Sequence, residues 1–325
     1  MSLSKIHYIA NRKMLTLLFV LVGSQTFACD ICGCFMGITP YFNRSSISLL
    51  YRYRSFNGYN GQSHSLFPNG GQFFIPPRQQ NSPITSHAGN PEDYELYRSM
   101  EIRGKYFINS RLEINGILPY VGNSERYNGY TSSISGIGDV NLFAGYHLIQ
   151  KLEDNFKQQL ITGAGIKIGT GKNDFKNSDG IRYSSLMQAG TGSTDGFIYL
   201  NYIVGLGKFG ASLNTSYKFN GTNSRGEGIA NSTTSFLNIF YVQRIGKDVQ
   251  VMPSAQFFYE YSGGEKYNGI KTGEHVMNNL MGGVGADIFY QNVSINLGIQ
   301  KNIWEAETDH PMSAGRVHLG VTYNF

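Results

Sequence analysis

Arg316-Val-His-Leu-Gly-Val-Thr-Tyr-Asn-Phe325, the last ten residues of the chain, alternate strictly between two kinds of side chain. Every second residue is aliphatic or aromatic, and the residues between them are polar or glycine. A period of two is typical of a β-strand with one apolar face and one polar face. Taken alone, this strand fits either the closing strand of a soluble sandwich or the last strand of a membrane barrel.

The amino terminus has the three regions of a secretory signal in the usual order. Three basic residues precede the apolar run Met14-Leu-Thr-Leu-Leu-Phe-Val-Leu-Val22, and small and polar residues follow it up to Ala28. The apolar run is much shorter than the roughly 20 residues that a transmembrane helix needs. We therefore predict that residues 1–28 are a signal peptide and that the mature chain begins at Cys29.

The composition favours a β-barrel in a membrane. Aromatic residues make up 14% of the chain, charged residues only 15%, and there are 40 Gly but 9 Pro. This balance suits a barrel whose outside meets lipid and whose inside meets water. A mean hydropathy of -0.25 excludes a helical membrane protein. The net charge of +5 is too small and too scattered to indicate a nucleic-acid partner.

Twelve segments alternate well enough to be predicted as strands, and an even number lets both chain ends lie on one side of a membrane. Because an open sheet edge is costly in lipid, we expect one closed, antiparallel, all-β transmembrane barrel of about 12 strands over residues 46–325. The predicted strands are 46–56, 95–108, 111–120, 138–149, 159–169, 196–206, 211–220, 235–245, 248–261, 279–290, 293–303 and 316–325.

The predicted connections alternate between short and long. Five short turns alternate with six longer connections at 57–94, 121–137, 170–195, 221–234, 262–278 and 304–315. This sorting is typical of outer-membrane barrels, which have tight periplasmic turns and long external loops. Connection 57–94 is the longest, and it is long enough to fold inward and narrow a pore or to remain an external loop.

Charged residues and histidines recur on the polar faces of the predicted strands. Both signs are present, and cations are in excess. Two interpretations stay open: a polar pathway with a mild preference for anionic or polar solutes, or a salt-bridged plug. Arg52, Arg54, Arg103 and Lys105, on the first two strands, are the favoured solute-facing patch. The full set predicted to face the lumen is Arg52, Arg54, Glu101, Arg103, Lys105, Arg111, Glu113, Asp139, His147, Lys167, Lys218, Arg244, Glu260, Asp287 and His318.

The three cysteines, Cys29, Cys32 and Cys34, lie together in a predicted periplasmic segment, residues 29–45. Thiolates at C-x-x-C-x-C spacing fit Cu(I) or Zn(II), which select soft sulfur ligands. A disulfide in an oxidising periplasm and lipidation of Cys29 are the alternatives. The sequence therefore leaves a metal-handling barrel open beside a solute channel and a sealed structural barrel.

Enzymatic motifs are lacking in the sequence. No Gly-x-Ser-x-Gly nucleophile elbow occurs. The glycine-rich stretch 163–171 lies within a predicted strand with no helix after it, so it is not a phosphate-binding loop. We therefore expect no catalytic activity; the expected partners are outer-membrane lipid and a small-molecule solute.

Two stretches carry a family resemblance: Gly136-Ile-Gly-Asp139, which opens a strand, and Gln188-Ala-Gly-Thr-Gly-Ser-Thr-Asp195. With Thr170-Gly171 between them, they resemble the outer-membrane transporters grouped with the meta-pathway of phenol degradation. Ile168-Gly169 stands where that family has Leu-Pro. The resemblance implies a channel for small, often aromatic or hydrophobic, solutes, which would pass passively.

The aromatic carboxyl terminus also carries a resemblance. It is similar to the terminal strand by which outer-membrane barrels are recognised for insertion, which implies that Phe325 binds the insertion machinery. Both chain termini are then expected in the periplasm.

Overall fold

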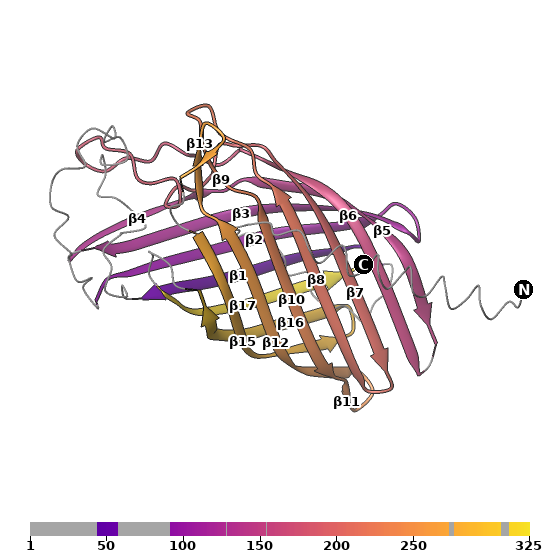
Figure 1. Ribbon diagram of the computed structural model, residues 1–325. Helices are drawn as coiled ribbons and strands as arrows, with labels where there is room; N and C mark the ends of the chain where they lie inside the picture. The colour runs from indigo at the N-terminus through magenta and orange to yellow at the C-terminus, as the bar shows by residue number, and fades with distance from the viewer. Residues whose placement is uncertain (1–43, 58–91, 128, 154, 273–275, 307–311) are drawn as a thin grey trace, which may run out of the picture.

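The computed structural model describes residues 44–57, 92–127, 129–153, 155–272, 276–306 and 312–325. They form one long antiparallel barrel (Figure 1). Within these ranges, no helix is long and apolar enough to cross a membrane.

The main sheet has 14 strands, of which β4 and β11 are short extensions, so twelve strands form the barrel wall. The predicted fold, a closed antiparallel barrel of about 12 strands, is confirmed. The wall strands are β1 (Ser46–Asn57), β2 (Tyr94–Phe107), β3 (Leu112–Tyr127), β5 (Val140–Leu152), β6 (Phe156–Ile168), β7 (Asp195–Leu206), β8 (Phe209–Phe219), β10 (Ser232–Tyr241), β12 (Val249–Gly263), β15 (Val276–Tyr290), β16 (Val293–Glu305) and β17 (Met312–Asn324).

The first and last strands close the barrel. β1 pairs with β17 from Ser46 opposite Asn324 to Asn57 opposite Met312, with one irregularity after Ser55. Farther round the wall, β10 pairs with β12. Every backbone edge of the wall therefore has a partner strand, as a barrel in lipid requires.

The connections sort by length, as the sequence predicted. Short turns join β2 to β3, β5 to β6, β7 to β8, β11 to β12 and β15 to β16 at one end, which we call the turn end. The start of β1 and the end of β17 lie at this same end. The longer connections lie at the opposite end, which we call the loop end. One of them, residues 169–194 between β6 and β7, is fully described and is called the β6–β7 connection.

Some segments that the sequence analysis assigned to loops are strands. β4 (Tyr130–Ile137) extends the wall by pairing with the second half of β3. At the loop end, β9 (Glu227–Ile229), β13 (Glu265–Tyr267) and β14 (Ile270–Lys271) form a separate three-stranded sheet. The turn between β13 and β14 is Asn268-Gly269, with φ angles of 49° and 81°. Asn-Gly is a strong hairpin signal, and the sequence also has it at residues 128–129, between β3 and β4.

The two faces of the wall are inverted relative to a soluble protein. On β17, Leu319 is 48% exposed and Tyr323 49%, whereas His318 is 1% exposed and Arg316 7%. The predicted faces of this strand are therefore correct. Apolar side chains cover the outside of the other wall strands as well, while serine, asparagine, glutamine and charged side chains are buried inside. An apolar exterior around a polar interior is the arrangement of a transmembrane barrel.

Candidate functional site

Most residues predicted to face the lumen are inside the barrel. Arg103 and Lys105 are partly buried. The fully buried members of the set are Arg52, Arg54, Glu101, Glu113, Asp139, His147, Lys167, Lys218, Glu260, Asp287 and His318.

Arg244 and Arg111 were predicted to face the lumen, and the structure shows that this prediction was wrong for both. Arg244 lies on β11 (Gln243–Ile245), whose three residues are all exposed and pair only with β12 at the turn end. The predicted strand 235–245 ends earlier because β10 stops at Tyr241, after which the Val242 amide donates a hydrogen bond to the Lys208 carbonyl. Arg111 is exposed in the turn between β2 and β3. Alternation fails at both positions because each lies where a strand ends.

Three groups of buried charges stand out among the described residues, and the first lies along β1, β2 and β12. Glu101 accepts from Arg52 and from Arg103, whose Nε lies 2.8 Å from Oε2. Arg54 binds Glu260 through both terminal nitrogens, with Nη1 2.8 Å from Oε2. The favoured solute-facing arginines are thus held by carboxylates: Arg103 by its own strand β2, Arg52 by the neighbouring strand β2, and Arg54 by β12, four strands away round the wall.

The second group lies near the loop end and is centred on Lys167. Its Nζ lies 3.0 Å from Asp139 Oδ2 and 2.7 Å from Asp195 Oδ2. Asp139 also accepts from the backbone N–H groups of Gly171 and Thr191, both at 2.9 Å. Both ends of the β6–β7 connection are therefore fastened to Asp139, which directly precedes β5. These are the residues on which the family resemblance rests.

The third group lies near the turn end. His147 Nε2 is 3.1 Å from Glu113 Oε2, while its Nδ1 is within hydrogen-bond distance of the side-chain amides of Gln150 (2.8 Å) and Gln159 (2.9 Å). If both amides donate, Nδ1 is the acceptor and Nε2 carries the proton that is donated to Glu113. This network joins β3, β5 and β6, and Gln150 also donates to the Ser110 carbonyl (3.0 Å) in the turn between β2 and β3.

Apolar side chains also fill parts of the lumen. Nearest the loop end, Phe56, Tyr97 and Met277 from β1, β2 and β15 enclose Met187, which is 0% exposed. Met187 belongs to the β6–β7 connection, so this segment reaches across the barrel mouth to strands that are not its neighbours. Asn123 on β3 holds it there, because its Nδ2 donates to the carbonyls of Met187 (3.2 Å) and Gln188 (3.3 Å).

Deeper in the lumen there are two more apolar clusters. Leu50, Phe236, Phe258 and Met281 form one of them. Phe240, Met252 and Phe289 form the other. Sequence reasoning missed these residues, since it expected a polar inner face. It also looked to connection 57–94 for a constriction; the structure places the β6–β7 connection at the mouth, and residues 58–91 are outside the described ranges.

The loop-end sheet is tied to the same region by Lys266. Its Nζ donates to the Asn220 carbonyl in the connection between β8 and β9. Burial lowers the pKa of the Lys266 amine, and the negative charge of Asp195 opposes that shift. The contact links β13 to the strands that carry the Lys167 group.

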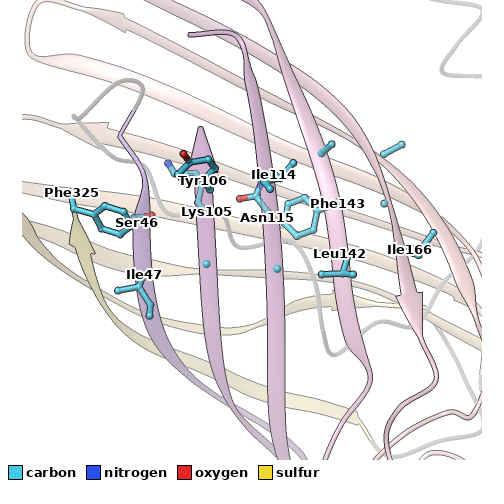
Figure 2. A pocket seen from close by; sticks show the side chains of 15 residues that line it. Ser46, Ile47, Lys105, Tyr106, Ile114, Asn115, Leu142, Phe143, Ile166 and Phe325 are labelled. Carbon is cyan, nitrogen blue, oxygen red and sulfur yellow. The ribbon is translucent and has the colours of Figure 1, made fainter. Parts of the chain in front are cut away.

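A further hollow lies on the outside of the wall, across β1, β2, β3, β5 and β6 near the chain termini (Figure 2). Ile47, Tyr106, Leu142 and Phe325 line it (Figure 2), together with small residues such as Gly104 and Ala144. This groove, of about 790 Å³, is lined almost entirely by apolar atoms. It is a feature of the lipid-facing surface, not of the lumen.

The structure offers no support for a metal site within its described residues, where no group of three or more His, Cys, Asp or Glu side chains is placed to hold an ion. Cys29, Cys32 and Cys34 lie outside the described residues. The predicted Cu or Zn site, the signal peptide and the segment 29–45 therefore stay predictions from sequence.

Solved structures share the architecture at low sequence identity. An outer-membrane channel from Pseudomonas putida F1 matches with a TM-score of 0.63 and 13% identity, covering 88% of this chain and 97% of that one. The β domain of the Bordetella autotransporter BrkA matches with a TM-score of 0.48 and 11% identity, over 87% and 100% of the two chains. The P. putida toluene transporter TodX matches at 0.38 and 10%, over 88% and 91%. At these identities the first match establishes the barrel fold alone.

No curated protein shows significant similarity to the chain. A family model does: the one described as "Putative MetA-pathway of phenol degradation" matches residues 93–319. The match extends well beyond the stretches at 136–139 and 188–195 and includes most of the barrel wall. The predicted resemblance is confirmed, and the chain is an outer-membrane β-barrel that belongs to this family.

Proposed function

We propose that the protein is an outer-membrane channel for small solutes and that the structure represents its closed form. The observation that carries the proposal is the position of Met187. A residue from the β6–β7 connection, and not from the wall, completes the apolar cluster at the barrel mouth. A closure made by a connecting segment can leave without any wall strand breaking its pairing.

The lumen below the closure supports passage of a polar or charged group. Its inner face carries buried arginine, lysine, glutamate, asparagine and glutamine side chains. Such residues are costly towards lipid and are retained where they line a pathway or pair with one another. The similarity to a P. putida protein described as an outer-membrane channel points the same way.

The orientation follows from the lengths of the connections. Barrels of the outer membrane place short turns in the periplasm and long loops outside the cell. We therefore propose that the turn end, with the start of β1 and the end of β17, faces the periplasm and that the β6–β7 connection closes the external mouth. Solutes then enter from outside when this segment moves, and they cross passively.

The test is conductance of the full chain in planar bilayers, comparing wild type with Met187→Ala. Shortening this side chain removes the centre of the cluster with Phe56, Tyr97 and Met277. We expect the open probability to rise at least tenfold. Met100→Ala is the matched control, because Met100 lies on the outer face of β2 and is 47% exposed; it should conduct like wild type.

The contrary outcome is also clear. If wild type and Met187→Ala both fail to conduct ions, and neither makes liposomes permeable to small sugars or aromatic acids, the barrel is a sealed structural protein and the channel proposal is wrong.

A further inference from the structure

Two arginines lie directly opposite each other inside the barrel. Arg54 on β1 is the cross-strand partner of Arg316 on β17, and the neighbouring pair on the same face is Arg52 with His318. Arg52, Arg54 and Arg316 are all buried. Like charges directly opposite on antiparallel strands destabilise the pair, and burial strengthens the repulsion.

Carboxylates in this region engage the arginines from other sides. Glu101 forms ion pairs with both Arg52 and Arg103. Glu260 forms an ion pair with Arg54, and its Oε1 accepts a hydrogen bond from Asn279 Nδ2 at 3.0 Å. Glu305 is near enough to feel the charge of Arg54, but its Oε2 accepts from Asn302 (2.7 Å) and from the Ser313 backbone (3.0 Å).

A small, partly open cavity lies beside these arginines, and we call it the arginine cavity. Its volume is about 20 Å³, and its lining is Arg52, Tyr53, Arg54, Tyr97, Ser99, Phe258 and Arg316. Three arginines are thus among the lining residues, and none of the described residues that line the cavity is an aspartate or glutamate.

The size and chemistry of the cavity restrict what it can hold. A space of roughly 10–15 Å³ or more admits one water-sized species. Guanidinium N–H groups are strong donors to anions, and a charge-assisted hydrogen bond is roughly twice as strong as a neutral one. Arg316 also stacks on Phe258, with its guanidinium carbon 3.9 Å from the ring centroid. Stacking uses the flat face of the guanidinium, while its donors lie in the plane.

We propose that the arginine cavity binds one small monovalent anion, either a free halide or the carboxylate group of a solute. The anion lies between Arg54 and Arg316, which the register of β1 and β17 places opposite each other. The cavity adjoins the Met187 closure, because Tyr97 belongs to both, and this position makes the cavity a selectivity point for anionic solutes. Binding stands by itself, whereas the selectivity role rests on the proposed channel function.

The binding test uses the purified full chain in detergent and a chloride-free buffer, titrated with chloride while the ³⁵Cl NMR line width is measured. Wild type should broaden the line saturably. Arg316→Gln should weaken binding at least tenfold, and Arg316→Lys should keep it within a few-fold. Arg98→Gln is the matched control: Arg98 is an exposed arginine of β2 that bonds Ser124, and its loss should leave the titration unchanged.

Competition separates the two sources of the anion. Acetate and benzoate should reverse the broadening if a solute carboxylate enters the cavity, and only bromide or iodide should do so if the site takes halide alone. Either result supports an anion site. Unaltered broadening in Arg316→Gln, or equal loss in Arg98→Gln, would overturn it.

A second measurement does not depend on any variant. Crystals of the wild-type protein soaked in bromide should give an anomalous peak between Arg54 and Arg316, and a peak absent there while present at surface sites also overturns the proposal. If bromide binds at the cavity but the protein does not conduct, the anion site is supported and the channel proposal is wrong. Conduction with a chloride-to-potassium permeability ratio unchanged by Arg316→Gln would retain the channel and reject the selectivity role.

Discussion

Lys167 on β6 and Asp195 on β7 are cross-strand partners, and the Lys167 Nζ lies 2.7 Å from Asp195 Oδ2. The same amine lies 3.0 Å from Asp139 Oδ2, so it contacts two buried carboxylates, and the Lys218 Nζ lies 3.9 Å from Asp195 Oδ2. Asp195 Oδ1 also accepts from the Gly221 backbone at 2.8 Å, as Asp139 does from Gly171. The wall thereby sets where two loop-end segments begin and end.

Replacing Lys167 with Met should therefore destabilise the folded barrel strongly. The change leaves Asp139 and Asp195 buried together without the amine between them. Breaking a buried ion pair by removing one partner costs about 3–5 kcal/mol. The measurement is the free energy of unfolding in urea from lipid vesicles. Lys172→Met is the control, because Lys172 is exposed and its Nζ makes only a long contact of 4.0 Å with Asp174 Oδ1. The loss of unfolding free energy in this variant should stay under about 1 kcal/mol. Equal costs for the two variants would refute the role of Lys167.

Asn123 should control how firmly the mouth is closed. Asn123→Ala removes both hydrogen bonds to the carbonyls of Met187 and Gln188, and leaving buried acceptors unpaired costs about 1–3 kcal/mol. We expect a higher open probability in planar bilayers than for wild type, with the unitary conductance unchanged, because the lumen below is intact. Asn57→Ala, at an exposed position of the loop end, should behave as wild type. An effect of Asn57→Ala as large as that of Asn123→Ala would point to general loosening of the loop end.

The barrel could be predicted from the sequence because its determinants are local. A period of two along Arg316–Phe325 fixes which side chains face lipid, and the lengths of the connections fix the order of turns and loops. The same alternation placed Lys167 and Asp139 on the inner face, whereas Asp195 was assigned to the end of connection 170–195. It could not say that one amine binds both carboxylates, because that depends on the register between strands and on a loop that returns to the wall.

The closure could not be predicted for the same reason. Met187 meets Phe56, Tyr97 and Met277 from strands far away in sequence, and nothing local in residues 184–190 indicates that contact. The inner apolar clusters were missed because a strand with a mixed inner face, such as β12 with Met252, Gln256 and Phe258, still alternates. The β13–β14 hairpin, by contrast, carried a local signal in Asn268-Gly269 that would have located it.

Gly283 should report how closely the inner surface of the wall is packed. A Cβ at this position on β15 would overlap the backbone carbonyl of Ile299 and the Cα of Gln300 on the neighbouring strand. Backbone cannot yield as a side chain can, so Gly283→Ala should cost about 1–3 kcal/mol of unfolding free energy. Gly104→Ala is the matched change, because nothing lies within 4 Å of a Cβ there; it should stay within about 0.5 kcal/mol of wild type. Similar costs at both sites would contradict the close β15–β16 contact.

Replacing Leu319 with Arg tests whether the outer face of the barrel contacts lipid. It lies in the middle of β17, between Tyr51 of β1 and Leu297 of β16, and points outward with 48% of its surface exposed. In water an exposed Leu→Arg change is almost neutral, whereas at the midplane of a bilayer it costs about 2–4 kcal/mol in a barrel. Leu152→Arg, at the turn end of β5, is the matched variant because the cost falls to about 0–1 kcal/mol near the interface. Folding free energies measured in vesicles should therefore differ by at least 1 kcal/mol between the two arginine variants. Equal values would mean that Leu319 lies outside the hydrocarbon layer, and the apolar exterior would then need another explanation.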